Sequence, residues 1–67
     1  MRHTVDRMIS KPSDYKRCER CGCWNWYENL ECINCGSNKF RKVTDRDVEG
    51  LKKAFEGYIL EELELEV

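Results

Sequence analysis

The sequence predicts a small α+β domain in which a short antiparallel β-sheet is followed by a C-terminal amphipathic helix. Three observations predict this fold class. Two Cys-x-x-Cys steps lie ten residues apart, stretches rich in aromatic residues lie beside them, and apolar residues recur at helical spacing near the end of the chain. The 67 residues have room for one domain, and so short a chain buries too little surface to be stable without a staple.

Residues 1–14 are predicted to form an N-terminal lead-in to the domain. Val5, Met8 and Ile9 are spaced like one face of a short helix. Pro12 ends such a helix, because proline biases the residue before it away from the helical region. We expect the chain to turn there and to continue into the sheet.

Residues 15–43 are predicted to hold the sheet and both cysteine steps. Residues 15–17 lead extended into the first step. Residues 24–28 alternate, with both tryptophans on one face, which favours a strand. Residues 39–43 leave the second step and have the composition of another strand. The two cysteine steps therefore lie at the ends of short strands.

The four cysteines of the paired steps have the spacing of a tetrahedral metal site. Each turn places two sulfurs on one side of an ion at about 2.3 Å, and two facing turns complete the set. The glycine after each pair can adopt positive φ, which lets backbone N–H groups turn toward the sulfurs. The predicted ligands are Cys18, Cys21, Cys32 and Cys35.

We predict that these ligands hold one structural Zn²⁺, with iron as an alternative ion. Four protein ligands close the site, and a closed site indicates structure and not catalysis. Binding of Zn²⁺ by thiolates contributes an apparent ~10–16 kcal/mol in small domains. Two zinc knuckles on a small antiparallel sheet form a zinc ribbon, and we predict that fold for residues 15–43.

Cysteine usage also indicates where the chain works. Five cysteines are an odd number, and the charged residues before position 11 do not form a signal peptide. We therefore expect a cytoplasmic protein in a reducing compartment, where metal binding is favoured over disulfides. The fifth cysteine, Cys23, is interpreted as a small strand residue near the metal, with an exchangeable ligand or a reactive thiol as the alternative. His3 is expected to be exposed.

Residues 44–67 are predicted to form a C-terminal helix and an acidic tail. Thr44 is a good N-cap, and Asp47 stands three residues later as an acidic variant of the capping box. One apolar stripe at helical spacing follows, made of Val48, Leu51, Phe55, Tyr58 and Ile59. Residues 63–67 alternate with period two, which fits a short strand as well as more helix.

The net charge of −1 is unevenly distributed. Residues 1–43 hold nine Lys/Arg and five Asp/Glu, a net charge of +4, whereas residues 44–67 hold three and eight, a net charge of −5. This asymmetry indicates either a basic face for nucleic acid or two halves that pair with each other. The candidate nucleic-acid contacts are Lys16, Arg17, Arg20, Trp24, Trp26, Lys39, Arg41 and Lys42.

The first functional hypothesis is a non-enzymatic recognition module, a small regulator or adaptor, in which the tryptophans stack on bases and the cations meet phosphates. The alternative for the tryptophans is that they form the core. The second hypothesis is a protein-interaction or homodimerisation module. Its partner surface would be the helix stripe of Leu51, Phe55, Tyr58 and Ile59.

An enzyme is not expected. The sequence has no Ser/His/Asp set and no phosphate-binding glycine loop, so we expect no small-molecule substrate. No apolar run approaches the roughly 20 residues that span a bilayer, so we expect no membrane partner. Iron in the four thiolates would make the chain an electron carrier, which is the third hypothesis.

From position 18 to position 35 the chain resembles the four-cysteine zinc fingers of the Ran-binding-protein type. Their pattern, Cys-x2-Cys-x3-Asn-x6-Cys-x2-Cys, is matched by the four cysteines and Asn25. Members of that family bind single-stranded RNA or ubiquitin, so the resemblance implies a recognition module. Lys16 stands where the family has its base-stacking tryptophan, and Gly22-Cys23 stands where ubiquitin-binding members have Thr-Phe.

The paired Cys-x-x-Cys-Gly steps also resemble the broader zinc-ribbon and rubredoxin-like class. Trp24 lies near the aromatic position of such knuckles, and Phe40 follows the second knuckle. This resemblance implies a ribbon fold, and its rubredoxin-like members imply iron and electron transfer.

Overall fold

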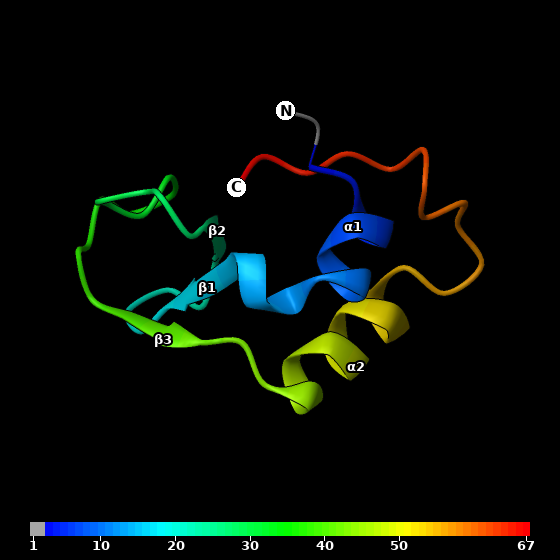
Figure 1. The fold of residues 1–67 in the computed structure, drawn as a ribbon, viewed down its shortest axis with the longest axis horizontal. Helices are drawn as coiled ribbons and strands as arrows, with labels where there is room; N and C mark the ends of the chain where they lie inside the picture. The colour runs from blue at the N-terminus through cyan, green and yellow to red at the C-terminus, as the bar shows by residue number, and fades with distance from the viewer. Residues whose placement is uncertain (1–2) are drawn as a thin grey trace.

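The computed structural model describes residues 3–67 and has an α+β architecture, as the sequence predicts (Figure 1). A three-stranded antiparallel sheet lies between two helices in the sequence. Along the chain the elements are α1 (Val5–Ser10), the 3-10 turn η1 (Pro12–Asp14), β1 (Tyr15–Cys18), β2 (Trp24–Trp26), β3 (Phe40–Lys42) and α2 (Asp45–Ala54). Within these described residues, no helix has the length and apolar character that crossing a bilayer requires.

The sheet has the strand order β2-β1-β3, so the strand that leads into the first cysteine step is central. Lys16 lies opposite Asn25 of β2 and opposite Lys42 of β3. β2 and β3 are shorter than predicted, whereas β1 includes all of the predicted residues 15–17. β2 ends at Trp26 because the chain turns there, and the Asn29 N–H donates back to the Trp26 carbonyl at 3.0 Å.

The short helix predicted around Val5 and Met8 is present as α1, while residues 1–2 of the predicted lead-in lie outside the described residues. Thr4 caps α1, with its Oγ1 accepting from the Arg7 N–H at 3.2 Å. Val5 and Met8 are fully buried on one side of α1. The helix ends before Pro12, which opens the 3-10 turn that leads into β1. The lead-in is therefore part of the core.

After α2 the chain passes through turns up to residue 62, and residues 63–67 then return across the molecule as an extended segment. Backbone hydrogen bonds hold it beside the start of α1 (Val5 N–H to Leu63 C=O, 2.8 Å) and beside β2 (Trp26 N–H to Val67 C=O, 3.1 Å). Figure 1 shows this segment running next to the N-terminal residues. The period-two alternation thus belongs to an extended chain, in which Leu63, Leu65 and Val67 pack on the core and Glu66 is exposed.

The core is formed by elements from both ends of the sequence. Its buried residues are Val5, Met8, Tyr15, Leu51 and Val67. Few large side chains are fully buried in so small a domain. The cluster is therefore covered by partly buried side chains, which include both tryptophans, Phe55 and the leucines of the C-terminal segment.

The predicted C-terminal helix is wrong in its second half, whereas the role of its stripe as a partner surface stays a prediction. α2 ends at Ala54, and Gly57 turns the chain with a φ of +90°. Tyr58 and Ile59 therefore lie outside the helix and are exposed, whereas Leu51 is buried and Phe55 packs on the core. The helix does not present a continuous surplus apolar face, since its inner face is used by the domain itself.

His3 is also placed differently from the expectation. It is half-buried, and its Nδ1 lies 3.1 Å from the Tyr15 hydroxyl. Its ring centroid is 5.0 Å from that of Trp26. Burial lowers the pKa of His3, helped by nearby positive charge. This histidine is a packing residue of the core edge and not an exposed terminal residue.

Candidate metal centre

The four cysteines of the paired steps meet at one point. The Sγ atoms of Cys18, Cys21, Cys32 and Cys35 all lie within 4.8 Å of one another. The Sγ atoms of Cys18 and Cys35 are 3.5 Å apart, as are those of Cys21 and Cys32, and both pairs join opposite knuckles. A regular tetrahedron with metal–sulfur distances of about 2.3 Å has edges of about 3.8 Å. The cluster therefore has the size and donor set of a four-thiolate metal site.

The two knuckles repeat the same backbone design. In the first, the Gly22 N–H donates to the Cys18 carbonyl at 2.9 Å; in the second, the Gly36 N–H donates to the Cys32 carbonyl at 2.9 Å. Both glycines have positive φ, +75° and +78°. Two constraints favour glycine at position 22: its positive φ, and the space beside it, because a Cβ there would lie 3.1 Å from Nη2 of Arg17. The glycines therefore permit the turns that bring four sulfurs together.

Backbone N–H groups point at the sulfurs. The N–H groups of Arg20 and Cys21 lie 3.3 and 3.5 Å from Cys18 Sγ, and that of Asn34 lies 3.4 Å from Cys32 Sγ. These donors favour the thiolate, because they stabilise its negative charge.

The pKa values of the thiols follow from these donors. The Cys21 N–H lowers the pKa of Cys18, and the Cys35 N–H, with the Asn25 amide, lowers that of Cys32 to about 5. The Ser37 N–H lowers the pKa of Cys35, but burial and hydrogen bonds with the other thiols outweigh it and raise that pKa to about 12. Four sulfurs this close repel one another as thiolates, and a divalent cation between them removes that repulsion.

Asn25 supports the cluster from within the core. Its side chain is fully buried, and its Nδ2 donates to the Cys23 carbonyl at 3.1 Å and to Cys32 Sγ at 3.5 Å. Its Oδ1 accepts from the Ile33 N–H at 2.9 Å and from Asn29 Nδ2 at 3.3 Å. One amide thus joins β2 to the second knuckle. Two features of the sequence could have indicated this role. The asparagine belongs to the cysteine pattern, and it lies on the strand face opposite the tryptophans.

The hydrogen bonds continue to the C-terminal segment. Asn29 Nδ2 also donates to the Val67 carbonyl at 2.8 Å. The chain of contacts therefore runs from Val67 through Asn29 and Asn25 to Cys32. Sequence reasoning missed this connection, because nothing local in the sequence relates position 67 to the knuckle.

Cys23 lies beside the cluster but is not one of its four members. Its thiol is half-buried and donates to the Trp24 carbonyl at 3.5 Å. Burial raises the pKa of Cys23, and the neighbouring cysteines raise it further. These contacts match the interpretation of Cys23 as a small packed residue.

Two of the predicted nucleic-acid contacts are engaged within the fold. Arg17 Nη1 lies 2.6 Å from Asp47 Oδ1, and Arg41 Nη1 lies 2.7 Å from Asp47 Oδ2. Asp47 also completes the capping box of α2, accepting from the Thr44 N–H at 2.9 Å. The Arg41 hydrogen bond, with those of Thr44 and Arg17, holds the pKa of Asp47 well below its usual range. This carboxylate therefore fastens α2 to β1 and β3.

The other predicted contacts fall into two groups. Lys16 donates to the Asn29 carbonyl and lies over the Phe40 ring, 3.9 Å from its centroid. Both tryptophans are half-buried against the core, which agrees with the alternative that they pack there. Among the predicted nucleic-acid contacts, three cations are exposed and form no ion pair with another described residue: Arg20, Lys39 and Lys42.

Comparison of the chain with protein-family models, with curated proteins and with solved structures found no match. The cysteine cluster and the antiparallel sheet are compatible with a zinc ribbon.

Proposed function

We propose that the four cysteines hold one structural Zn²⁺ and that the chain is a non-enzymatic recognition domain of the reducing cytoplasm. The support is the closed set of four sulfurs with donors aimed at them. Elemental analysis with an absorption spectrum, on protein purified without added metal, tests the ion. One zinc per chain without visible colour supports the proposal, whereas one iron with a thiolate band that bleaches on reduction favours an electron carrier.

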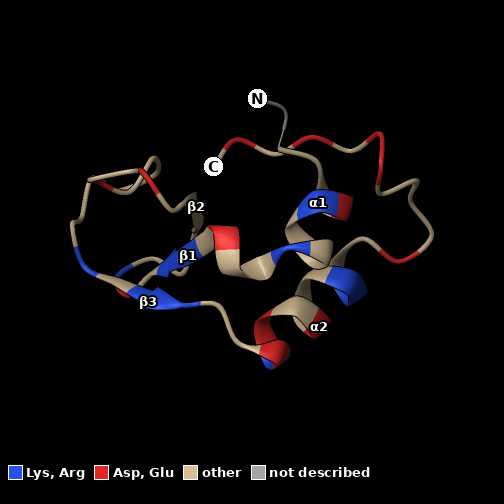
Figure 2. Cartoon of the chain, in the orientation of Figure 1, with Lys and Arg blue, Asp and Glu red and all other residues tan. Residues whose placement is uncertain are grey.

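The partner that we propose is single-stranded nucleic acid. The observation that carries this proposal is that Lys and Arg gather on the sheet, whereas both helices carry charges of both signs (Figure 2). Lys and Arg lie on β1, β3 and the loop before β3, while the acidic C-terminal segment lies beside α1. The arginines of the sheet pair with Asp47 of α2, which two guanidinium groups share. A surface with surplus positive charge attracts a phosphate backbone.

Fluorescence anisotropy with labelled ten-nucleotide RNA and DNA, at 50 and 200 mM salt, tests this partner. The informative variant is Lys39→Gln with Lys42→Gln, because both side chains are exposed. Each lost phosphate contact lowers the slope of log K against log salt by about 0.7, so the double variant loses about 1.4. The matched control is Lys52→Gln with Lys53→Gln on α2, whose slope is expected to stay unchanged. Equal losses in both pairs contradict a specific basic face.

The pair Arg41→Glu and Lys42→Glu is a poor probe of binding. Arg41 makes two hydrogen bonds with Asp47, and reversal of its charge breaks the contact that fastens α2 to the sheet. A loss of affinity in that variant would therefore mix unfolding with binding, whereas the two exposed lysines avoid this ambiguity.

A protein partner is the second candidate, and one observation favours it. Tyr27, Leu30 and Ile33 are exposed by 52, 87 and 51% and lie within seven residues around the second knuckle. Exposed apolar side chains so close in sequence are typical of an interaction surface. Sedimentation of the zinc-loaded chain tests homodimerisation, and Leu30→Ser with Ile33→Ser would return a dimer to monomer. A monomeric wild-type chain at 0.1 mM contradicts the dimer.

A further inference from the structure

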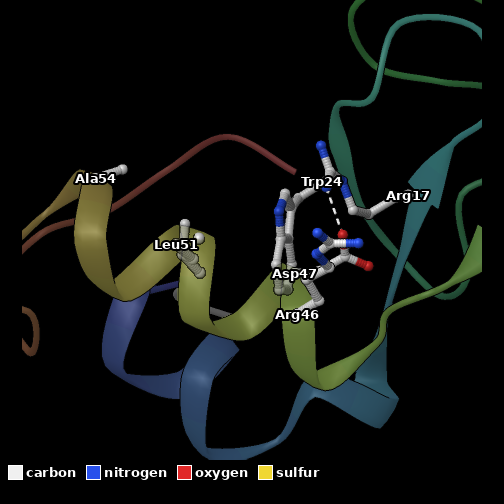
Figure 3. Close-up of a pocket in the computed structure, with 7 residues that line it drawn as sticks. Arg17, Trp24, Arg46, Asp47, Leu51 and Ala54 are labelled. Carbon is white, nitrogen blue, oxygen red and sulfur yellow. Dashed lines mark hydrogen bonds and ion pairs between the residues drawn. The ribbon is translucent and has the colours of Figure 1, made fainter.

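A cavity opens between the sheet and α2, on the side of the sheet that carries Arg17. Its volume is about 280 Å³, and Trp24, Gly50 and Leu51 line it together with Arg17, Arg46, Asp47 and Ala54. Figure 3 shows the Trp24 indole edge-on, with Leu51 of α2 on one side and the Arg17 side chain on the other. The volume lies just below the range of about 300–1,000 Å³ for ligand pockets, so it suits one flat ring system and not a larger ligand.

Trp24 is held firmly although it borders open space. It packs against the buried Tyr15, with ring centroids 6.3 Å apart, and β2 fixes its backbone. The indole is therefore half-buried, and it lines the cavity together with Leu51 and Arg17. A fixed aromatic surface binds a stacking partner with little loss of side-chain entropy.

Gly50 lines the cavity from the helix side without a side chain of its own. It lies in the middle of α2, where glycine weakens a helix relative to alanine. No positive φ requires glycine there, and a Cβ at this position would meet nothing within 4 Å. The fold gives no packing reason for glycine, and its effect is to leave the helix backbone open beside the indole.

The rim of the cavity is positive. Arg17 and Arg46 line it, and Arg41 reaches its edge through Asp47. The single carboxylate of Asp47 is shared by two arginines. Arg46 is exposed and forms no ion pair within residues 3–67. The cavity thus lies on the side of the sheet where Arg17 and Arg41 are opposite each other across β1 and β3, and Arg46 offers it a free cation.

We propose that this cavity binds one unpaired base of a single-stranded nucleic acid, stacked on Trp24 above Gly50, with an adjacent phosphate at Arg46. The inference rests on the proposed function and adds the place and form of recognition. Stacking requires an exposed base face, so the site selects single strands over duplexes. Among the described residues that line the cavity, the hydrogen-bonding side chains are Trp24, the paired Asp47 and two arginines, so we expect weak discrimination among bases.

The decisive variant is Gly50→Leu in the full zinc-loaded chain. Leucine is a strong helix former, and its side chain would extend into the cavity and cover the indole. We expect the melting temperature to rise by about 4–8 °C while the Kd for a labelled ten-nucleotide strand rises by about 5- to 150-fold. Opposite changes in stability and affinity separate this result from a folding defect. Gly50→Ala should keep the rise in stability with a smaller loss of affinity.

An abasic strand of the same length and phosphate number provides the second measurement. It should bind the wild-type chain as weakly as the normal strand binds Gly50→Leu, and it should leave the tryptophan fluorescence unchanged, whereas the normal strand quenches it. If the wild-type chain binds both strands equally, or if Gly50→Leu binds like wild type, the base site is refuted while the basic face stands. If the wild-type chain binds neither strand, the proposed nucleic-acid function and this site are both refuted.

Discussion

Replacing Asn25 with aspartate tests whether the buried amide stabilises the cysteine cluster. The change keeps the volume and the Oδ1 acceptor but removes the Nδ2 donor, which bonds to the Cys23 carbonyl and to Cys32 Sγ. A lost bond to a carbonyl costs about 1 kcal/mol, and one to a charged sulfur costs about 2 kcal/mol. A total of about 3 kcal/mol, before any repulsion from the new carboxylate, weakens apparent zinc binding by about 150-fold.

Competition with a chromophoric chelator measures that affinity, and a thermal melt should show a decrease of roughly 10–20 °C. The matched control is Asn34→Asp, which adds the same charge on the same knuckle at an exposed position. Its side chain does not contact the sulfurs, since only its backbone N–H does. If Asn34→Asp lowers zinc affinity as much as Asn25→Asp, negative charge explains the loss; if neither does, Asn25 is not a support of the site.

Three further predictions follow from the packing. Cys32→Ser should lose the metal and the cooperative melt, whereas Cys23→Ser should keep one metal per chain. If Cys23→Ser loses the metal and Cys32→Ser keeps it, Cys23 is the ligand. Asp47→Asn should lower the free energy of unfolding by about 2 kcal/mol in urea titrations. Because the folded pKa of Asp47 is lowered, its contribution is complete above the unfolded value of about 4 and is lost only as the pH falls toward the folded pKa. The loss in Asp47→Asn should therefore be constant from pH 5 to 8, and a loss that changes across that window would contradict the lowered pKa. Val67→Ser should cost about 2 kcal/mol because Val67 is buried, whereas the exposed Glu66→Ala should stay within about 0.5 kcal/mol in the same urea assay.

Features that depend on local spacing were accessible from the sequence. The four cysteines form one cluster, because a Cys-x-x-Cys turn followed by glycine fixes two sulfurs within a few residues. The start of α2 at Thr44 also follows from the sequence, since the capping box closes within one turn. The end of the helix before Pro12 has the same local origin.

Features that depend on distant contacts were decided by the tertiary structure alone. Arg17 and Arg41 looked like free cations in the sequence, but the sheet brings both to Asp47. The stripe that continued to Ile59 looked like one helix, but the chain turns at Gly57 and returns extended, so that Val67 reaches Asn29. Periodicity describes which residues share a face, whereas the partner of that face depends on how segments far apart in the sequence meet. The sequence by itself therefore determined the four-cysteine cluster, which could hold a metal ion, and the tertiary structure decided which charges and rings remain exposed.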